Sequence, residues 1–188
     1  YNGSSWSQQG SDLDGAAAGD EQGSSVSLSS DGTTLAVGAN GHNNKGTVRI
    51  YTYNGTAWTQ QGSDLDGEAN NDYQGFSVSL SSDGTILAVG AYGHDTREVI
   101  VKGAVRIYAF NGTAWSQQGG DLDGEVNNDR QGYSVSLSSD GTTLAVGAYG
   151  HDNDNKGTVR VYTYNGTAWV PKGSNLDGTD AGDKQGWS

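Results

Sequence analysis

One unit of about fifty residues is written several times along this chain, and the repeat constrains the fold more than any other feature. Tryptophans that begin at Trp6 follow one another at intervals of 52, 57 and 54 residues, and glycines that begin at Gly23 keep the same intervals. The two markers therefore agree on a single register. A period of this length is typical of a supersecondary unit that buries its apolar surface only by stacking on its neighbours.

Each unit predicts four short strands and no helix. In the first full unit the candidate strands read SVSLS, TLAVGA, TVRIYTY and TAWTQQ, and the Asp-Gly and Asn-Gly dipeptides among them are strong hairpin signals. Apolar residues alternate with a period of two, and no window shows the 3.6-residue spacing of an amphipathic helix. Four antiparallel strands of this kind form the blade of a β-propeller, in which sheets pack face to face around an axis. We therefore predict an all-β chain, a β-propeller of four-stranded antiparallel blades.

The markers divide the chain into three complete blades at residues 23–74, 75–131 and 132–185. Residues 1–22 are expected to hold the outer strand and linker of a preceding blade, and residues 186–188 to begin another. Because closed propellers usually have about four to eight blades, we expect the chain to belong to a six- to eight-bladed ring, with seven blades the best fit. The rest of a longer parent chain, or a second copy of this one, would then close the ring.

The repeat resembles the FG-GAP repeat of integrin alpha-subunit propellers and their relatives. The residues that carry the resemblance are Gly75–Leu80, Leu87–Ala91 and Gly157–Tyr162, with their equivalents in the other units. Three features depart from the family: Gln74-Gly75 replaces its Phe-Gly pair, Gly-Ala-Tyr or Gly-Ala-Asn replaces its Gly-Ala-Pro, and Ser-Ser-Asp-Gly replaces its calcium loop. That tight turn offers too few oxygen ligands for calcium, which takes six to eight. The resemblance implies a propeller with an adhesive role outside the cell, without calcium at the family position.

Composition excludes several classes of function. Ten Lys and Arg against 22 Asp and Glu give a net charge of −12, which would repel a nucleic acid backbone. The chain has no Cys, so neither disulfides nor thiolate metal sites are available. It also lacks the run of about 18 apolar residues that direct insertion into a membrane requires. No cofactor is indicated by any motif.

The variable loops of the repeat are expected to form a binding face. Antiparallel strands place the loop between the second and third strands on the same side of the disc as the linker between blades. All the length variation falls in the first of these loops, from four residues after His42 to nine after His94 and six after His151. Variable loops on a rigid scaffold are typical of binding surfaces. The candidate residues on this face are His42, Tyr92, His94, Asp95, Tyr149, His151 and Asp152.

These candidates have structural alternatives. The three histidines stand at equivalent positions of different blades, too far apart to share a metal ion, so copying of the repeat explains them better. Tyr92 and Tyr149 could stack on a sugar, although exposed aromatic side chains often bind nothing.

The acidic linkers could bind calcium through hard oxygen ligands. The candidate ligands are Asp64, Asp66, Asp72, Asp121, Asp123 and Asp129. Asp and Asn also cap turns with their own side chains, and we favour this structural role.

The Asn-Gly turns also fit the acceptor pattern for N-glycosylation, at Asn2, Asn54, Asn111 and Asn165. The pattern has two explanations, because the same dipeptide is what a type I′ hairpin turn prefers.

No catalytic triad, phosphate-binding loop or zinc spacing is present, so the sequence favours a chain that is not an enzyme. The leading hypothesis is an extracellular adhesion or structural module that binds a protein, matrix or cell-surface partner through the variable loops. The main alternative is a multivalent lectin that binds glycans weakly at each blade. A propeller hydrolase is a third alternative, because propellers can host enzymes.

Overall fold

The computed structural model describes residues 3–95, 101–152 and 154–188, and these residues confirm the all-β prediction. Their one helical element is a single turn of 3-10 helix, η1 (His42–Asn44). No helix within these ranges has the length and apolar character needed to cross a membrane. Residues 96–100, in the long loop after His94, lie outside the described ranges.

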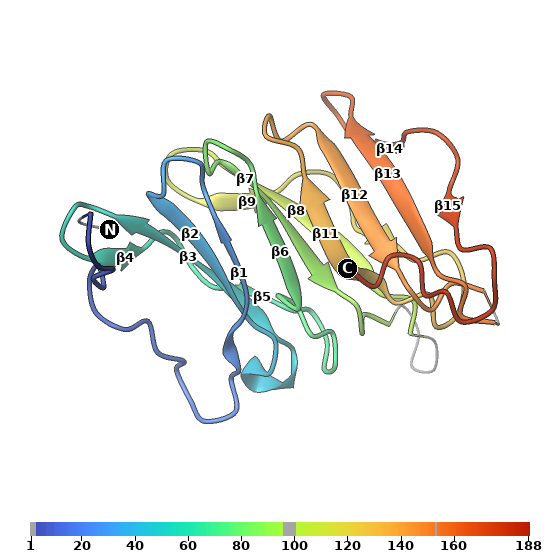
Figure 1. Cartoon of the computed structure of the whole chain (residues 1–188), viewed down its shortest axis with the longest axis horizontal. Helices are drawn as coiled ribbons and strands as arrows, with labels where there is room; N and C mark the ends of the chain where they lie inside the picture. Colours follow the sequence, from blue (N-terminus) through green and yellow to red (C-terminus); the bar gives the residue numbers. More distant parts are fainter. Residues whose placement is uncertain (1–2, 96–100, 153) are drawn as a thin grey trace.

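Three antiparallel sheets stand side by side in sequence order, and we call them the first, second and third blades (Figure 1). The first blade contains β1 (Gln22–Leu28), β2 (Thr34–Ala39), β3 (Thr47–Tyr53), β4 (Trp58–Gln60) and β5 (Leu65–Asp66). The second contains β6 (Ser77–Leu80), β7 (Ile86–Ala91), β8 (Ala104–Phe110), β9 (Trp115–Gln117) and β10 (Leu122–Asp123). The third contains β11 (Gln131–Leu137), β12 (Thr143–Ala148), β13 (Thr158–Tyr164), β14 (Trp169–Pro171) and β15 (Leu176–Asp177).

The outer strand of each blade is longer than the sequence suggested and is split in two. Both β4 and β5 pair with β3, with Tyr53 opposite Trp58 and Val48 opposite Leu65. Leu65 stands in the acidic linker between blades, next to Asp64 and Asp66, where the repeat predicts no strand. Leu65 instead packs against the apolar core between the first two blades, which explains why the chain returns to the sheet there.

Apolar side chains from facing sheets form one core cluster between each pair of neighbouring blades. The first cluster joins Val48 and Ile50 of the first blade to Leu87 and Val89 of the second. The second cluster repeats this arrangement one blade further along, with Val105 and Ile107 facing Leu144. Each blade therefore stabilises its neighbour, as expected of units that cannot fold alone.

The inner strands of neighbouring blades approach closely enough to exchange hydrogen bonds. The hydroxyl of Ser77 in β6 donates to the carbonyl of Gly132 in β11 at 2.8 Å. Gly90 must be glycine, because a Cβ there would overlap the same carbonyl oxygen.

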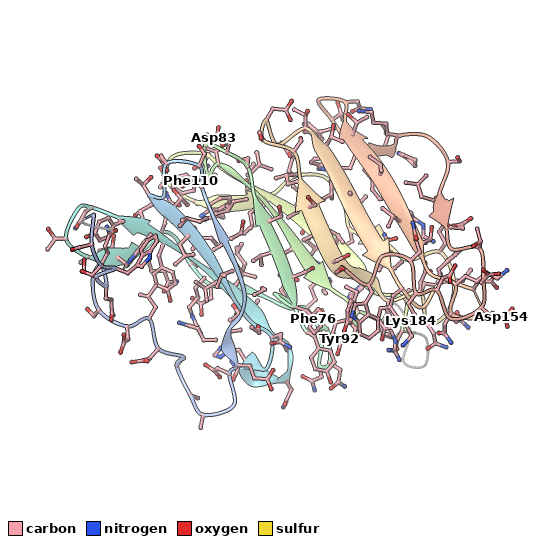
Figure 2. The ribbon with its side chains drawn as sticks, in the orientation of Figure 1. Phe76, Asp83, Tyr92, Phe110, Asp154 and Lys184 are labelled. Carbon is pink, nitrogen blue, oxygen red and sulfur yellow. The ribbon has the colours of Figure 1, made fainter. Side chains whose placement is uncertain are left out.

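On the opposite side the short turns are also linked in series. The amide of Ser82 donates to the carbonyl of Ser139 at 2.8 Å, and the amide of Ser30 donates to that of Ser82 at 2.9 Å. Asp83, labelled in Figure 2, stabilises one such turn by accepting a hydrogen bond from Ser81 at 2.6 Å.

Candidate functional site

The loop after the second strand of each blade is held against the linker that enters the same blade. The amide of Gly93 donates to the carbonyl of Asp72 at 3.2 Å, and Gly150 makes the same bond to Asp129. We call the surface formed by these loops and linkers the loop face. In Figure 2 the labelled Phe76, Tyr92 and Lys184 lie along this edge, whereas Asp83 lies on the opposite one.

Beneath the loop face each blade contains a polar network centred on an arginine. In the second blade, Arg106 of β8 is 1% exposed. Its Nε donates to Asp121 at 2.9 Å and its Nη1 donates to Gln74 at 2.7 Å. Gln74, also buried, donates through Nε2 to the carbonyls of Leu65 and Asp66 in the outer strand of the first blade. Gln74 therefore links Arg106 to the preceding blade.

A histidine and an aspartate complete this network. Nδ1 of His94 lies 3.0 Å from Oδ1 of Asp72, whose other oxygen accepts hydrogen bonds from the amides of Glu68 and Ala69. Burial alone would raise the pKa of Asp72, but the hydrogen bond with His94 and the amide donors hold it below its usual value. The hydrogen bond with Asp72 raises the pKa of His94 and outweighs the opposite effect of burial.

The network recurs in the other two blades with small changes. Arg49 donates to Asp64 at 2.9 Å and to Gln22 at 2.6 Å. In the third blade Arg160 donates to Gln131 at 2.6 Å, but Asn175 stands where the other blades have aspartate. Nε of Arg160 is consequently buried without a hydrogen-bond partner among the described residues.

This network changes the interpretation of the three candidate histidines. His94 is 9% exposed and its ring joins Asp72 to Arg106. His151 makes the same contacts with Asp129 and Arg160, and Nδ1 of His42 lies 3.0 Å from Oδ2 of Asp20. All three hold loops in place from below.

The other candidate residues of the loop face differ in their exposure to solvent. Tyr149 is 7% exposed, Tyr92 and Asp95 are half-buried, and Asp152 is exposed.

The acidic residues considered as possible calcium ligands fall into separate environments. Asp72 and Asp129 are fully buried in the networks, whereas Asp66 and Asp123 are exposed at strand ends. Asp64 and Asp121 pair with arginines.

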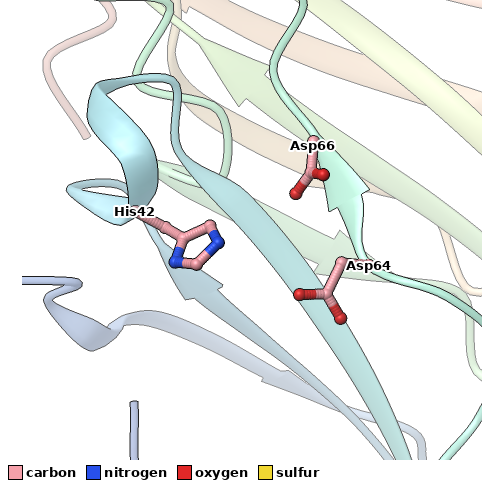
Figure 3. Close-up of side chains that lie close together, drawn as sticks. All are labelled: His42, Asp64 and Asp66. Atoms are coloured by element: carbon pink, nitrogen blue, oxygen red, sulfur yellow. The ribbon is translucent and has the colours of Figure 1, made fainter. Parts of the chain in front are cut away.

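The structure does bring His42, Asp64 and Asp66 together, each offering one ligand atom within 4.8 Å of the others (Figure 3). A similar group joins Glu68, His94 and Asp121. One aspartate of each group, Asp64 or Asp121, already forms an ion pair with an arginine. Three ligands also fall short of the six to eight that calcium takes.

The sequence motifs for N-glycosylation lie on the turn side. Asn54, Asn111 and Asn165 are exposed, and each side-chain oxygen accepts the amide two residues further on, at 2.9 to 3.0 Å. The asparagines therefore have a structural role in the turns. Asn2 lies outside the described residues.

A continuous row of aromatic rings runs along the loop face, and the sequence analysis identified only two of its members. Ring centroids lie 4.4 to 5.5 Å apart along the row. The row consists of Tyr73, Tyr92, Phe76, Tyr133, Tyr149 and Trp187. Phe76, Tyr133 and Trp187 occupy one repeat position, directly after the glycine of a Gln-Gly pair, and this regularity was a usable signal.

A groove of about 610 Å³ opens at the third-blade end of this row. Its aromatic walls are Tyr149 and Trp187, and its charged side chains are Arg130, Lys184 and Asp152. The remaining lining residues are Asn127, Asn128, Gly150 and Asn155. Its volume lies within the range of roughly 300 to 1,000 Å³ typical of ligand sites.

Comparisons with known proteins identify the repeat. Residues 122–164 match the family model described as FG-GAP repeat. No curated protein sequence matches the chain.

Solved structures resemble the chain in fold. A protein assigned as a 6-phosphogluconolactonase from Bacteroides fragilis is similar with a TM-score of 0.56 and 16% identity, over 83% of this chain and 39% of that one. Sqt1 of Saccharomyces cerevisiae gives 0.57 and 14%, over 87% and 38%. The periplasmic gluconolactonase PpgL of Pseudomonas aeruginosa gives 0.50 and 20%, over 80% and 45%. The chain thus spans about two fifths of the length of these proteins.

These neighbours correct one expectation. The lack of catalytic motifs favoured a chain that is not an enzyme, but gluconolactonases of similar fold are enzymes, so that conclusion was wrong. At 14 to 20% identity the likeness shows the fold alone. The three stacked sheets, the solved neighbours and the matching family model all indicate the same fold. The chain is therefore a β-propeller array that carries an FG-GAP repeat at residues 122–164.

Proposed function

We propose that the chain is an interaction module of an extracellular protein and binds a protein, matrix or cell-surface partner through the loop face. The observation that carries this proposal is the row of aromatic rings that runs along the loop face. Tyr92 and Phe76 of this row are only partly buried, and aromatic side chains at a surface are typical of binding sites.

Two further features support the proposal. The arginine networks beneath the loops hold the face rigid, which lowers the ordering cost of binding. FG-GAP repeats also usually occur in extracellular proteins, in agreement with the repeat at residues 122–164.

The absence of cysteine allows a direct test by site-specific blocking. A single cysteine at Asn127 on the loop face, or at Thr113 on the turn side, would be coupled to a bulky polyethylene glycol maleimide. Binding of each conjugate to immobilised decellularised extracellular matrix would be measured on a biosensor. We expect the Asn127→Cys conjugate to lose binding and the Thr113→Cys conjugate to retain it. Equal loss in both conjugates, or no binding by the unlabelled protein, would refute the proposal.

A further inference from the structure

Within the described residues the dipeptide Asn-Gly occurs four times, and the fold places it in two different environments. Three copies, at Asn54, Asn111 and Asn165, lie in exposed turns before the outer strands. The fourth is Asn40-Gly41, where Asn40 directly follows β2 and is 8% exposed. Asn111 is the best place to examine the turns, because its blade has a described blade on each side.

An Asn-Gly pair can undergo a reaction within its own backbone. The nitrogen of the glycine attacks Cγ of the asparagine, and the new C–N bond closes a cyclic imide. The bond from Cγ to Nδ2 breaks, and Nδ2 leaves as ammonia with the proton that the glycine amide loses. Water then adds to the imide: opening at Cγ gives aspartate, whereas opening at the backbone carbonyl gives isoaspartate, whose main chain runs through the side chain. The rate depends on how well the two reacting groups are positioned.

The turn at Asn111 folds the asparagine side chain over the peptide that follows it. Oδ1 of Asn111 accepts the amides of Thr113 and Ala114, both at 2.9 Å. These bonds hold Cγ near the nitrogen of Gly112, because that nitrogen lies within the ring of atoms that the first bond closes. Both donors also point at the oxygen that becomes negative when Cγ is attacked, as the donors of an oxyanion hole do. Asn54 accepts the equivalent two bonds.

The glycine of each turn leaves room for the attack. Asn111 and Gly112 are exposed, and a Cβ at Gly112 would meet nothing within 4 Å. Gly55 has equally open surroundings, and both glycines have a φ of 94°, which glycine adopts without strain. Solvent can therefore remove the amide proton and later open the imide.

Asn40-Gly41 has the opposite properties. The amide of Gly41 donates to the carbonyl of Asp20 at 3.2 Å, so the attacking nitrogen is already held in a hydrogen bond. A Cβ at Gly41 would overlap the carbonyl oxygen of Gly19, so little space surrounds it. Oδ1 of Asn40 is buried without a hydrogen-bond partner among the described residues, so no donor there polarises its carbonyl.

We infer that Asn54 and Asn111 are sites of spontaneous deamidation, because the bonds that stabilise each turn also promote imide formation, and that the fold protects Asn40 from the same reaction. Asn165 accepts the same two bonds and should behave as they do. Each conversion adds a negative charge to the turn side. The modification is independent of the proposed partner binding, because these turns lie on the side opposite the loop face.

The test compares asparagines within one molecule. Protein from a bacterial host without N-glycosylation would be incubated at mildly alkaline pH, in native buffer and in concentrated guanidinium chloride. Peptide mapping by mass spectrometry would measure the conversion at each site, and chromatography would separate isoaspartate from aspartate.

The expected rates follow from the two environments. In denaturant Asn40, Asn54 and Asn111 should react at similar rates, because the chain has lost its local structure. In native buffer Asn54 and Asn111 should react at least as fast as in denaturant, whereas Asn40 should react at least about tenfold more slowly. Slower reaction of the turn sites in native buffer than in denaturant, or conversion of Asn40 without that slowing, would overturn the inference.

A variant tests whether the turn itself promotes the reaction. Ala114→Pro removes one of the two amide donors to Asn111 and keeps the carbonyl that accepts the amide of Asn111. The ratio of native to denatured rate at Asn111 should fall at least about threefold, less than the loss in an enclosed oxyanion hole because water can replace the donor. Asn54 in the same molecule is the matched control and should keep its ratio. An unchanged ratio at Asn111 in the folded variant would overturn the inference, and if the variant does not fold, the rates of the parent protein decide it.

Discussion

Nη2 of Arg106 lies 3.2 Å from Nδ1 of His94 inside the second blade, and Oδ1 of Asp72 lies 3.0 Å from the same ring nitrogen. One nitrogen therefore faces both a cation and a carboxylate. A ring with a proton on Nδ1 donates to Asp72, whether the ring is charged or is the neutral Nδ1–H tautomer, whereas the Nε2–H tautomer can accept from Arg106 at Nδ1. The presence of a proton on Nδ1 of His94 thus selects the bond that holds this loop.

The first prediction concerns pH. The pKa of His94 is raised above 6.5 by its hydrogen bond to Asp72, so its contribution to stability is present below pH 6.5 and is lost as pH rises through the folded-state pKa. The pKa of Asp72 is lowered below 3.8, so its contribution is lost as pH falls through that lower value. Denaturant unfolding should therefore show a stability maximum between these limits.

The measurement for this prediction is direct. A proton NMR titration of His94 should give a midpoint above 6.5, and Asp72→Asn should move the midpoint down because the carboxylate is lost. A midpoint at or below 6.5 in the parent protein would contradict the assignment.

The second prediction restores a missing partner. Asn175→Asp would give the buried Nε of Arg160 the acceptor that Asp121 gives Arg106. We expect the free energy of unfolding to rise by about 1 kcal/mol, the scale of a hydrogen bond to a charged group after partial screening. Urea denaturation measures the change. Asp121→Asn in the second blade is the matched control and should lower stability; a gain there would argue against the pairing.

The third prediction tests the close approach of inner strands. Gly90→Ala would push a Cβ into the backbone carbonyl of Gly132, so at least one blade must shift. A loss of about 3 kcal/mol is expected from overpacking at a site that cannot relax. Gly120→Ala is the control, because a Cβ at Gly120 meets nothing within 4 Å. Thermal unfolding of the two variants should differ clearly, and similar melting temperatures would refute the contact.

The fourth prediction uses equivalent leucines. Leu80 is 7% exposed between the first and second blades, whereas Leu28, at the same repeat position, is 55% exposed. Leu80→Ala should cost about 2 to 5 kcal/mol by leaving a cavity. Leu28→Ala should cost less than about 0.5 kcal/mol, as surface changes do. Equal losses in chemical denaturation would mean that the blades do not pack as described.

The fold was predictable because three signals indicate the same four strands in every unit: the length of the repeat, the Asp-Gly and Asn-Gly turns, and the alternation of apolar residues within each strand. The split outer strand was missed because Leu65 follows two residues after the Gly-Ser pair that reads as a loop, and only packing against the next blade draws it back to β3. The Arg106 network did leave a signal: an arginine lies between the two aliphatic residues of each third strand, and Gln74 and its equivalents recur in a Gln-Gly pair at the start of each unit.

The groove, in contrast, left no signal in the sequence. Arg130 and Lys184 lie 54 residues apart, and Tyr149 lies between them in another loop. Only the stacking of two linkers against one loop places them around the same cavity, so no local pattern could reveal the groove.

The series of hydrogen bonds from Ser30 to Ser82 to Ser139 limits where insertions can be accepted in the sequence during evolution. An extra residue in the middle turn, at Ser82, would disturb its bonds to both neighbouring turns, so an insertion there is penalised twice. The segments after His42, His94 and His151 differ in length from blade to blade, so they do tolerate new length. Sequence diversity can therefore accumulate in the loops on one side of the array, while the turns on the other side keep the spacing between blades.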